Sequence, residues 1–522
     1  MIHTYILWIF HGHTIYMFNS NAMKSGEEPF HPADSGLKTL PVTEKNLRTV
    51  FSACDDFQTR AMEIGEHCNI SVFICWLDGL ISGSNLSEDI LRPLTDSRRM
   101  GGAADASQAI ARILQGGVYG GAVKSRSDCE SLSQDILNGC CAIVFPETET
   151  ALSFEVKSDK MRSISESTLE KSVKGAKDAF IETLRVNTAL VRKKLRTPKL
   201  KSEERTIGRK SATRVSVMYV QEIAQEQRVQ DLLRRLERID IDGLTASGYL
   251  EQYLVDQPSS PFPQMLHTER PDTFASYLLD GRIGILVDGL PIGFAVPAQL
   301  TRFMRVTEDR ANHFTVASML ILLRYIALFF ALFLPGLYVA IAMYHQEMLP
   351  TQLLISIIDA KQQVPFSTAA EVLGMLIAFE LLQEAGLRLP APVGNTVSII
   401  GALIVGQSAV DARIISPIAV IIVAFSGISS YTLPSQDLAS AVRVLRFFAV
   451  LAAMGAGLFG VMAAAVFFVW HLSSLESYGV AYLCPLVDGD SGSWLWSFLR
   501  KPLWLDRFRD PRLAGRDKRR QK

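Results

Sequence analysis

The sequence predicts an α/β soluble N-terminal region of two small units, followed by an all-α multi-helix transmembrane domain. Three observations lead to this fold class. A chain of 522 residues is too long for one compact domain. Asp, Glu, Lys and Arg are scarce between residues 311 and 499 and frequent elsewhere. The hydrophilic part alternates short β-branched runs with stretches of helical periodicity, whereas the apolar part contains segments long enough to cross a bilayer.

Changes in composition along the chain predict five parts. Residues 1–45 are expected to form a disordered N-terminal extension. Residues 46–160 and 161–310 are expected to form the first and second α/β units. Residues 311–475 are expected to form the transmembrane helical domain, and residues 476–522 a basic C-terminal tail.

The N-terminal extension carries no clear export signal. Its apolar run, residues 5–10, is shorter than the about 20 residues that span a bilayer. No Lys or Arg precedes the run and no small-residue cleavage site follows it. The composition becomes ordinary from Met23, which we interpret as the biological start. Without an export signal, the two hydrophilic units are expected to stay in the cytoplasm.

Turn residues and apolar runs predict the elements of the first unit. Residues 69–77 are β-branched and aromatic and end at an Asp-Gly pair, which is typical of a buried strand. Further strands are expected at residues 140–145 and 151–156, and helices at residues 87–94 and 128–137. This alternation of strands and helices indicates an α/β or α+β unit.

The second unit shows similar signals. Residues 180–195 have apolar positions at helical spacing, with basic residues in the last turns, where they suit the helix dipole. Residues 213–220 alternate like a strand, residues 225–239 predict another helix, and residues 282–296 predict a β-hairpin around an Asp-Gly pair. The basic stretch 193–210 is interpreted as a solvated face or linker, or as a contact for anionic lipid or a partner subunit.

Composition and motifs argue against nucleic-acid binding and catalysis. Lys and Arg number 53, equal to Asp and Glu, so the basic excess of a nucleic-acid binder is missing. The glycine-rich residues 116–125 lack P-loop spacing, because two residues separate the last glycine from Lys124. The seven cysteines show no zinc-ligand spacing, and neither His67 nor His267 has a catalytic context. We therefore expect no enzyme activity, no metal and no cofactor, and a binding or assembly role for the soluble region.

Five apolar segments predict the transmembrane domain. They cover residues 314–344, 369–387, 393–410, 414–433 and 442–472. The last segment contains small residues four positions apart, Ala453/Gly457 and Ala456/Gly460, a spacing that allows helices to pack closely. Residues 351–362 predict a short amphipathic helix on the membrane surface.

Charged residues inside these segments are the most informative ones, because a carboxylate in hydrocarbon costs at least about 2.5 kcal/mol and should face protein or water. The candidates are Arg324, Glu371, Glu380, Glu384 and Arg388. Glu384 and Arg388, four residues apart on one helix face, would form an ion pair that locks helices together near the interface. In the alternative interpretation, Glu380 or Glu371 faces a water-filled path and attracts cations.

The third apolar segment carries a stripe of small, weakly polar residues. Such a stripe usually packs against another helix, but repeated around a symmetry axis it can line a narrow pore. The pore-lining candidates are Asn395, Ser398, Ala402, Leu403, Val405, Gly406 and Gln407. Among them, Leu403, Val405 and Gln407 are the candidate constriction positions.

Charge alone does not settle the topology. The tail at residues 500–522 holds ten Lys or Arg against three Asp, which favours the cytoplasmic side. A cytoplasmic N-terminal region then requires an even number of crossings, whereas five apolar segments are an odd number. Therefore either one segment is re-entrant or interfacial, or the longest segment does not form a single crossing.

Several stretches between residues 69 and 486 carry a recognisable pattern: KGAKDAFIETLRVNTALVRKKLR (174–196), GRKSATRVSVMYV (208–220), LLDGRIGILVDG (278–289), LRYIALFFALFLPGLYVAIAMYHQEMLPT (323–351) and SIIGALIVGQSAV (398–410). Together they resemble the A-subunit family of spore germination receptors of endospore-forming Firmicutes. One departure is Ser167, where the family usually has proline after Ser-Glu. This departure is expected to loosen the linker between the two soluble units.

The resemblance implies a function that the composition does not. It implies the pore-forming subunit of a nutrient-gated channel that releases monovalent cations across the spore inner membrane. It also implies a transporter-like B subunit that binds the germinant, a lipoprotein C subunit, and a homo-oligomer, expected to be a pentamer. Two other functions remain open at this point. One is a non-conducting scaffold that transmits the signal, and the other is a secondary transporter, which internal repeats would favour.

Overall fold

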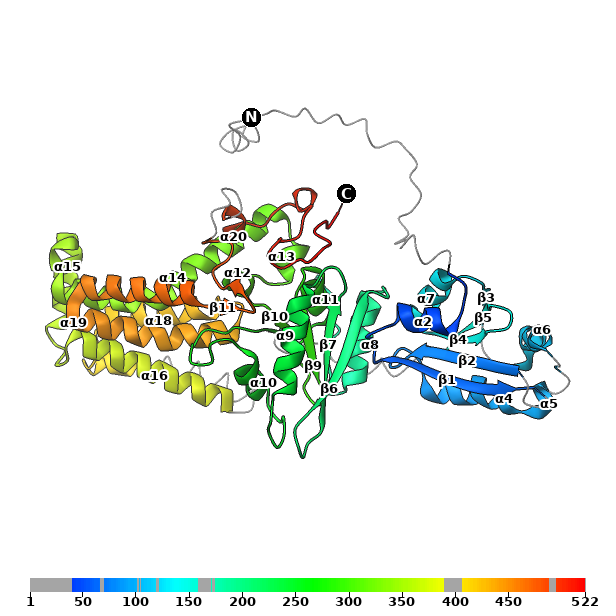
Figure 1. Cartoon of the computed structure of the whole chain (residues 1–522). Helices are drawn as coiled ribbons and strands as arrows, with labels where there is room; N and C mark the ends of the chain where they lie inside the picture. Colours follow the sequence, from blue (N-terminus) through cyan, green and yellow to red (C-terminus); the bar gives the residue numbers. More distant parts are fainter. Residues whose placement is uncertain are drawn as a thin grey trace, which may run out of the picture.

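The computed structural model describes residues 40–65, 70–100, 103, 105–118, 122–157, 170, 174–388, 406–487 and 494–521. These residues form three parts in a row (Figure 1). A first unit with a five-stranded sheet lies at one end, a second unit with another five-stranded sheet lies in the middle, and a bundle of helices lies at the other end. The predicted fold class, an α/β region followed by an all-α region, is confirmed.

The sheet of the first unit is antiparallel, in the order β1-β2-β4-β5-β3. Its strands are β1 (Phe57–Ile64), β2 (Ile70–Leu77), β3 (Val123–Arg126), β4 (Cys140–Phe145) and β5 (Thr150–Glu155). The strands predicted at residues 69–77, 140–145 and 151–156 are present as β2, β4 and β5. The sequence analysis missed β1 and β3, because their polar and charged side chains hide the alternation that marks a strand.

Helices cover both faces of this sheet. Ile74 and Ile143 belong to a core shared with α4 (Arg92–Thr95) and α6 (Ala106–Arg112). Their neighbours in the strands, such as Val144, belong to a second core shared with α2 (Glu44–Val50) and α7 (Cys129–Leu137). Every residue of β4 is therefore buried. Residues 41–45, which the sequence analysis placed in the extension, pack on this unit, since the Thr43 side chain caps α2.

The second unit repeats this plan with a sheet in the order β6-β7-β9-β10-β8. Its strands are β6 (Leu200–Ile207), β7 (Thr213–Val220), β8 (Leu266–Thr268), β9 (Ile283–Val287) and β10 (Gly293–Val296). Its helices are α8 (Leu184–Lys194), α9 (Glu226–Glu237), α10 (Ser247–Leu254) and α11 (Pro271–Leu279). The predicted strand at residues 213–220 and the predicted hairpin are present. The basic stretch interpreted as a linker contains β6, which pairs with β7 along its whole length.

Two glycines let α11 lie directly on this sheet. A Cβ atom on Gly284 would come within 2.2 Å of the Phe274 ring, and one on Gly293 within 2.7 Å. Phe274 is fully buried in the core that α8 and α11 share with the sheet. The absence of a side chain at both positions therefore makes room for the aromatic ring.

A buried ion pair joins the two units. The Arg192 guanidinium, on α8, donates to both carboxylate oxygens of Asp56, just before β1, and both side chains are 0% exposed. A third nitrogen of Arg192 donates to the Leu200 carbonyl at 3.2 Å. Burial alone would lower the pKa of Arg192, but the charge and hydrogen bonds of Asp56 outweigh burial and raise it. Two backbone hydrogen bonds continue the contact: the Asp55 amide donates to the Ser202 carbonyl at 2.8 Å, and the Ser202 amide donates to the Ala53 carbonyl at 2.9 Å.

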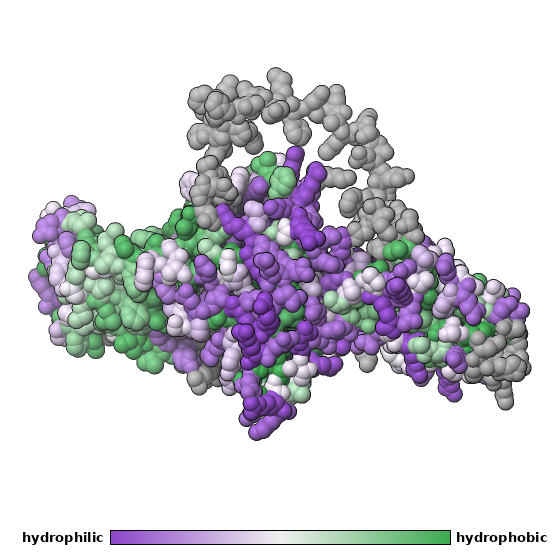
Figure 2. Space-filling view, viewed as in Figure 1, coloured by the Kyte–Doolittle hydropathy of each residue, from purple (hydrophilic) through white to green (hydrophobic). Residues whose placement is uncertain are grey.

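The helical region contains two helices that are long and apolar enough to cross a membrane, α14 (Phe314–Tyr344) and α19 (Gln436–Ser474). It also contains α15 (Thr351–Lys361), α16 (Thr368–Arg388) and the apolar α18 (Pro417–Tyr431). Hydrophobic surface covers these helices as a band (Figure 2). Hydrophilic surface borders the band on the second unit and at the opposite end, where α15 lies.

Helix α19 folds back on itself. Its helical geometry breaks at Ala456 and Gly457, and Gly457 has a φ of +59°. A Cβ atom on Gly460 would lie 1.9 Å from the Ala452 carbonyl oxygen. Residues eight apart are about 12 Å apart in a straight helix, so the chain reverses here. The small residues predicted to form a helix-packing face therefore lie at and beside a reversal, visible as two orange rods that meet near α15 (Figure 1).

The fold-back brings both ends of α19 to the second unit. The start of α19 contacts the second unit through Asp437, and its end contacts the same unit through His471, which lies 2.9 Å from Ser260. The chain thus leaves the second unit at α14 and returns to it after α19. The single segment predicted at residues 442–472 is a helical hairpin.

The C-terminal segment returns to the second unit. It includes the hairpin β11 (Glu476–Ser477) and β12 (Val480–Ala481), and then α20 (Leu495–Phe498). The Gly515 amide donates to the Ile223 carbonyl at 2.6 Å, and the Asp517 amide to the Glu222 carbonyl at 2.9 Å. The predicted basic tail is thus held on the soluble part.

We expect Asp56→Ala to weaken the contact between the two units by about 3–5 kcal/mol, because it leaves the Arg192 guanidinium buried without its counter-charge. Hydrogen–deuterium exchange of β1 and β6, in the purified full chain in detergent, would report this loss as faster exchange. Arg209→Ala is the matched control, since the Arg209–Asp240 pair is exposed and its loss should change little. Unchanged exchange in Asp56→Ala would show that the buried pair does not hold the units together.

Candidate functional site

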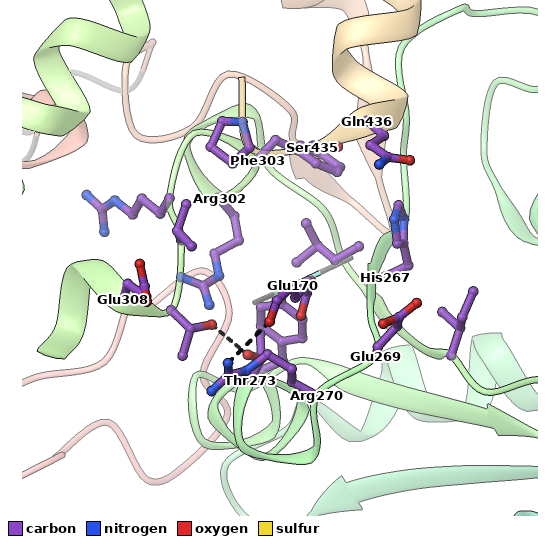
Figure 3. A pocket seen from close by; sticks show the side chains of 17 residues that line it. Glu170, His267, Glu269, Arg270, Thr273, Arg302, Phe303, Glu308, Ser435 and Gln436 are labelled. Carbon is purple, nitrogen blue, oxygen red and sulfur yellow. Dashed lines mark hydrogen bonds between the residues drawn. The ribbon is translucent and has the colours of Figure 1, made fainter. Parts of the chain in front are cut away.

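A cavity of about 220 Å³ lies where the second unit meets the helical region. Its walls come from β8 and α11, from the segment that leads into α14, and from the turn before α19 (Figure 3). We call it the junction pocket. Its labelled side chains are Glu170, His267, Glu269, Arg270, Thr273, Arg302, Phe303, Glu308, Ser435 and Gln436.

An ion pair at the edge of the junction pocket joins the sheet to α19. The Nδ1 atom of His267, on β8, lies 2.9 Å from a carboxylate oxygen of Asp437, in the first turn of α19. Burial alone would lower the pKa of His267, but the hydrogen bond and charge of Asp437, with two nearby glutamates, outweigh burial and raise it. A carboxylate in the first turn also suits the dipole of α19. The pair therefore fixes the start of α19 to the edge strand of the second unit.

The opposite wall ties α11 to the segment before α14. The hydroxyl groups of Thr273 and Thr307 lie 2.6 Å apart. The Thr268 hydroxyl donates to the Glu170 carboxylate at 2.5 Å, and burial raises the pKa of Glu170 despite this bond. The junction pocket thus connects one sheet to the beginnings of α14 and α19.

The side chains around this pocket connect the second unit to the beginnings of two helices. Its walls carry both signs of charge, and two of these side chains pair with carboxylates beside the pocket, His267 with Asp437 and Arg270 with Asp272. In the described part of the chain, no three His, Cys, Asp or Glu side chains lie close enough together to hold a metal ion. A displacement of β8 or α11 would act directly on α14 and α19.

The predicted intramembrane charges lie in three places. Arg324 lies near the second unit, where its guanidinium donates to both oxygens of Asp309 at 2.6 and 3.0 Å. Glu371, on α16, is 2% exposed and accepts from the Ser416 amide, at the start of α18, at 2.9 Å. The other oxygen of Glu371 has no partner among the described residues.

Glu380 lies at the centre of a charged cluster between the helices. It accepts from Arg446 at 2.8 Å and from Arg443 at 3.3 Å, both on α19. Arg446 is 1% exposed and also donates to the Ser426 hydroxyl, on α18, at 3.1 Å. This cluster joins α16, α18 and α19.

Sequence reasoning missed these partners. No local pattern in the sequence places Arg443 and Arg446 beside Glu380, which lies on a distant segment. The signal that could have suggested a pair is the presence of two arginines inside an apolar segment that must find a counter-charge. The expected Glu384–Arg388 pair involves the Arg388 side chain, which lies outside the described residues.

Most pore-lining candidates also lie outside the described residues, namely Asn395, Ser398, Ala402, Leu403 and Val405. Gly406 and Gln407 begin the next described helical stretch. Gly406 is buried against Val420, on α18, and Gln407 is exposed. The role of the third apolar segment therefore stays a prediction.

Known proteins resemble most of this chain. The family model described as "Bacillus/Clostridium GerA spore germination protein" matches residues 45–512. Spore germination protein KA of Bacillus subtilis (strain 168) is 35% identical over 95% of this chain and 90% of its own length. The uncharacterized membrane protein YfkQ of the same strain is 35% identical over 88% of each chain. The N-terminal domain of the A subunit of the Bacillus megaterium spore germinant receptor GerK3 is 28% identical, over 49% of this chain and 93% of that domain, with a TM-score of 0.39.

The His267–Asp437 pair should make the junction sensitive to pH. The pKa of His267 is raised in the folded chain, so protonated His267 stabilises the folded chain. This stabilisation is fully present below the ordinary histidine pKa of about 6.5, and it is lost as the pH rises through the raised pKa. Hydrogen exchange of β8 and of the first turn of α19, corrected for intrinsic rates, should therefore accelerate across this range. His267→Gln should abolish that dependence, and His345→Gln, at the far end of α14, should keep it. The same pH profile in His267→Gln would contradict this role.

Glu380→Gln should destabilise the helical region by about 3–5 kcal/mol, because two arginines lose their counter-charge in a low-dielectric site. Thermal unfolding in detergent would measure the loss. Glu347→Gln, in the exposed loop after α14, is the control with the same chemical change. If Glu380→Gln leaves stability unchanged but lowers cation selectivity, the carboxylate faces a water path instead.

Proposed function

Because the chain belongs to the GerA family of spore germination proteins, we propose that it is the A subunit of a germinant receptor and forms an oligomeric, nutrient-gated ion channel. In this proposal the channel lies in the spore inner membrane and releases monovalent cations. It acts with a B subunit that binds the germinant and with a lipoprotein C subunit. The observation that carries the proposal is the family match over residues 45–512. Catalysis is not part of it.

A multi-pass arrangement agrees with the shape of the helical region. The apolar band is bordered by hydrophilic surface at both ends (Figure 2). In the proposed arrangement α14 crosses the membrane away from the second unit, and the two halves of α19 cross in opposite directions. Both soluble ends then lie on the same side, and the ten Lys or Arg of residues 500–522 favour the cytoplasmic, spore-core side.

The ion path is proposed to run between copies of the chain. Within one copy, Glu380 and Arg324 are engaged in ion pairs, so these charges serve helix packing. Large apolar side chains on α14, α18 and α19 are exposed, among them Phe329, Ile421 and Phe459, and can face lipid or neighbouring copies. The small residues at positions 393–410 would then surround a central axis, in a homo-oligomer expected to be a pentamer.

Gating is proposed to pass through the junction pocket. A movement of the second unit, driven by nutrient binding to the B subunit, would pull on β8 and α11. The contacts of His267 with Asp437, and of Thr273 with Thr307, would carry that movement to α19 and α14. The buried Arg192–Asp56 pair connects the first unit to the second, so the two units are proposed to move together.

A second candidate is a non-conducting scaffold that transmits the signal to another subunit. The pairing of Glu380 with two arginines inside one copy favours it, because such a cluster seals the space between α16 and α19. The two candidates differ in whether the third apolar segment borders water.

Replacing Ala402 or Gly406 with Leu should decrease nutrient-triggered cation flux at least about tenfold, since a narrow pore cannot accommodate the added side chain. The measurement is flux from vesicles that contain the chain with its B and C partners, exposed to the medium that germinates the parent spores. Gly374→Leu is the control, because Gly374 is exposed on α16 with no atom near its added Cβ. Normal flux in both variants, with all subunits assembled, would favour the scaffold.

A further inference from the structure

A second cavity, of about 700 Å³, lies behind the junction pocket. Arg302 and Arg305 line both cavities and separate them. Its walls are α12 (Leu300–Phe303), α13 (Glu308–Ala311), the beginning of α14 and the C-terminal segment. We call it the basic cavity.

Positive charge exceeds negative charge in the basic cavity. Nine arginine and lysine side chains line it, against four aspartates. The aspartates are already engaged: Asp280 contacts three arginines, and Asp309 is held by Arg324. Burial and the charge of Arg302 lower the pKa of Arg310 to about 10.

Three buried N–H groups in this wall have no acceptor within the described part of the chain. The clearest is on Gln299, which lines the cavity and is 4% exposed. Its Oε1 accepts from Arg282 at 2.8 Å, whereas its Nε2 has no partner. The Nε atoms of Arg302 and Arg305 are likewise buried and have no acceptor among the described residues. A buried donor without an acceptor costs about 1–3 kcal/mol, so a ligand rich in acceptor oxygens would be stabilised here.

Guanidinium groups bind phosphate with matching geometry, and charge-assisted hydrogen bonds of this kind are strong. The chemistry of the cavity thus fits a phosphate group. Two sources can supply one: a lipid headgroup or a free phosphate.

The surroundings favour a lipid. Four apolar side chains of the neighbouring C-terminal segment are exposed: Leu503, Trp504, Leu505 and Phe508. The Trp504 ring packs edge-on against Phe314, the first residue of α14, at 5.6 Å. Tryptophan is enriched at membrane surfaces, and basic pockets beside membrane helices bind anionic headgroups.

We propose that the basic cavity binds the phosphate of an anionic phospholipid, on the membrane side that carries the second unit. The bound headgroup accepts hydrogen bonds from Gln299, Arg302 and Arg305, and its acyl chains run along the start of α14. The lipid then connects the C-terminal segment to the region between the second unit and the first membrane helix. This role goes beyond ion conduction and holds whether or not the chain forms a pore.

Gln299→Glu is the sharpest test, because it is isosteric. Its carboxylate keeps an acceptor for Arg282 and so preserves the fold, but it replaces the unpartnered donor with a negative charge. Arg302→Gln removes one charge from the same wall. Arg209→Gln, on the exposed β6–β7 turn, makes the same change in net charge far from the cavity.

Binding of phosphatidylglycerol, phosphatidylcholine and inorganic phosphate to the purified full chain in detergent can be followed by native mass spectrometry. We expect a preference for phosphatidylglycerol over phosphatidylcholine. Gln299→Glu and Arg302→Gln should each weaken phosphatidylglycerol binding at least about tenfold, which corresponds to 1.4 kcal/mol, and Arg209→Gln should not. If the two variants weaken the binding of inorganic phosphate but leave the binding of phosphatidylglycerol unchanged, the lipid assignment is wrong. Lipid binding that ignores both variants would overturn the site.

Discussion

The second unit and the helices share one apolar core, and the polar contacts at the junction are arranged around it. Tyr482 is fully buried at its centre, and its ring lies 6.2 Å from Phe303 and 6.4 Å from Phe262. Its backbone accepts from the Leu300 amide and donates to the Leu475 carbonyl, both at 2.9 Å. The same core includes Leu438 and Ala449, from α19. The second unit and the helical region thus share one apolar core, so a movement of either part must change the packing of the other.

This packing explains why the polar contacts at the junction matter. Apolar contacts fix the distance between the parts but are not directional. The His267–Asp437 pair and the hydrogen bond between Thr273 and Thr307 depend on orientation, so they fix how β8 and α11 are oriented relative to the helices. On the far side, the Glu380 cluster holds α16, α18 and α19 together, so a displacement at the junction reaches several helices. The lipid proposed for the basic cavity would add a link to the membrane surface.

The sequence predicted those parts of the fold that are encoded locally. Strand β7 and the hairpin of β9 and β10 follow from alternation and from an Asp-Gly turn. Strand β6 was missed because it lies at the edge of the sheet and carries charged side chains, which made it look like a linker. The reversal in α19 was missed because apolar character continues through Gly457, and only contacts with distant residues such as Tyr344 reveal the turn. The partners of Glu380 depend on tertiary packing in the same way, as does the cavity around Gln299.

The proposed channel requires several copies to place residues 393–410 around a water-filled axis. A high-resolution cryo-EM map of the assembled receptor in lipid, with and without the triggering nutrient, tests it most directly. We expect a continuous column of solvent along that axis when the nutrient is bound. Helices packed side chain to side chain along the whole axis in both states would contradict it.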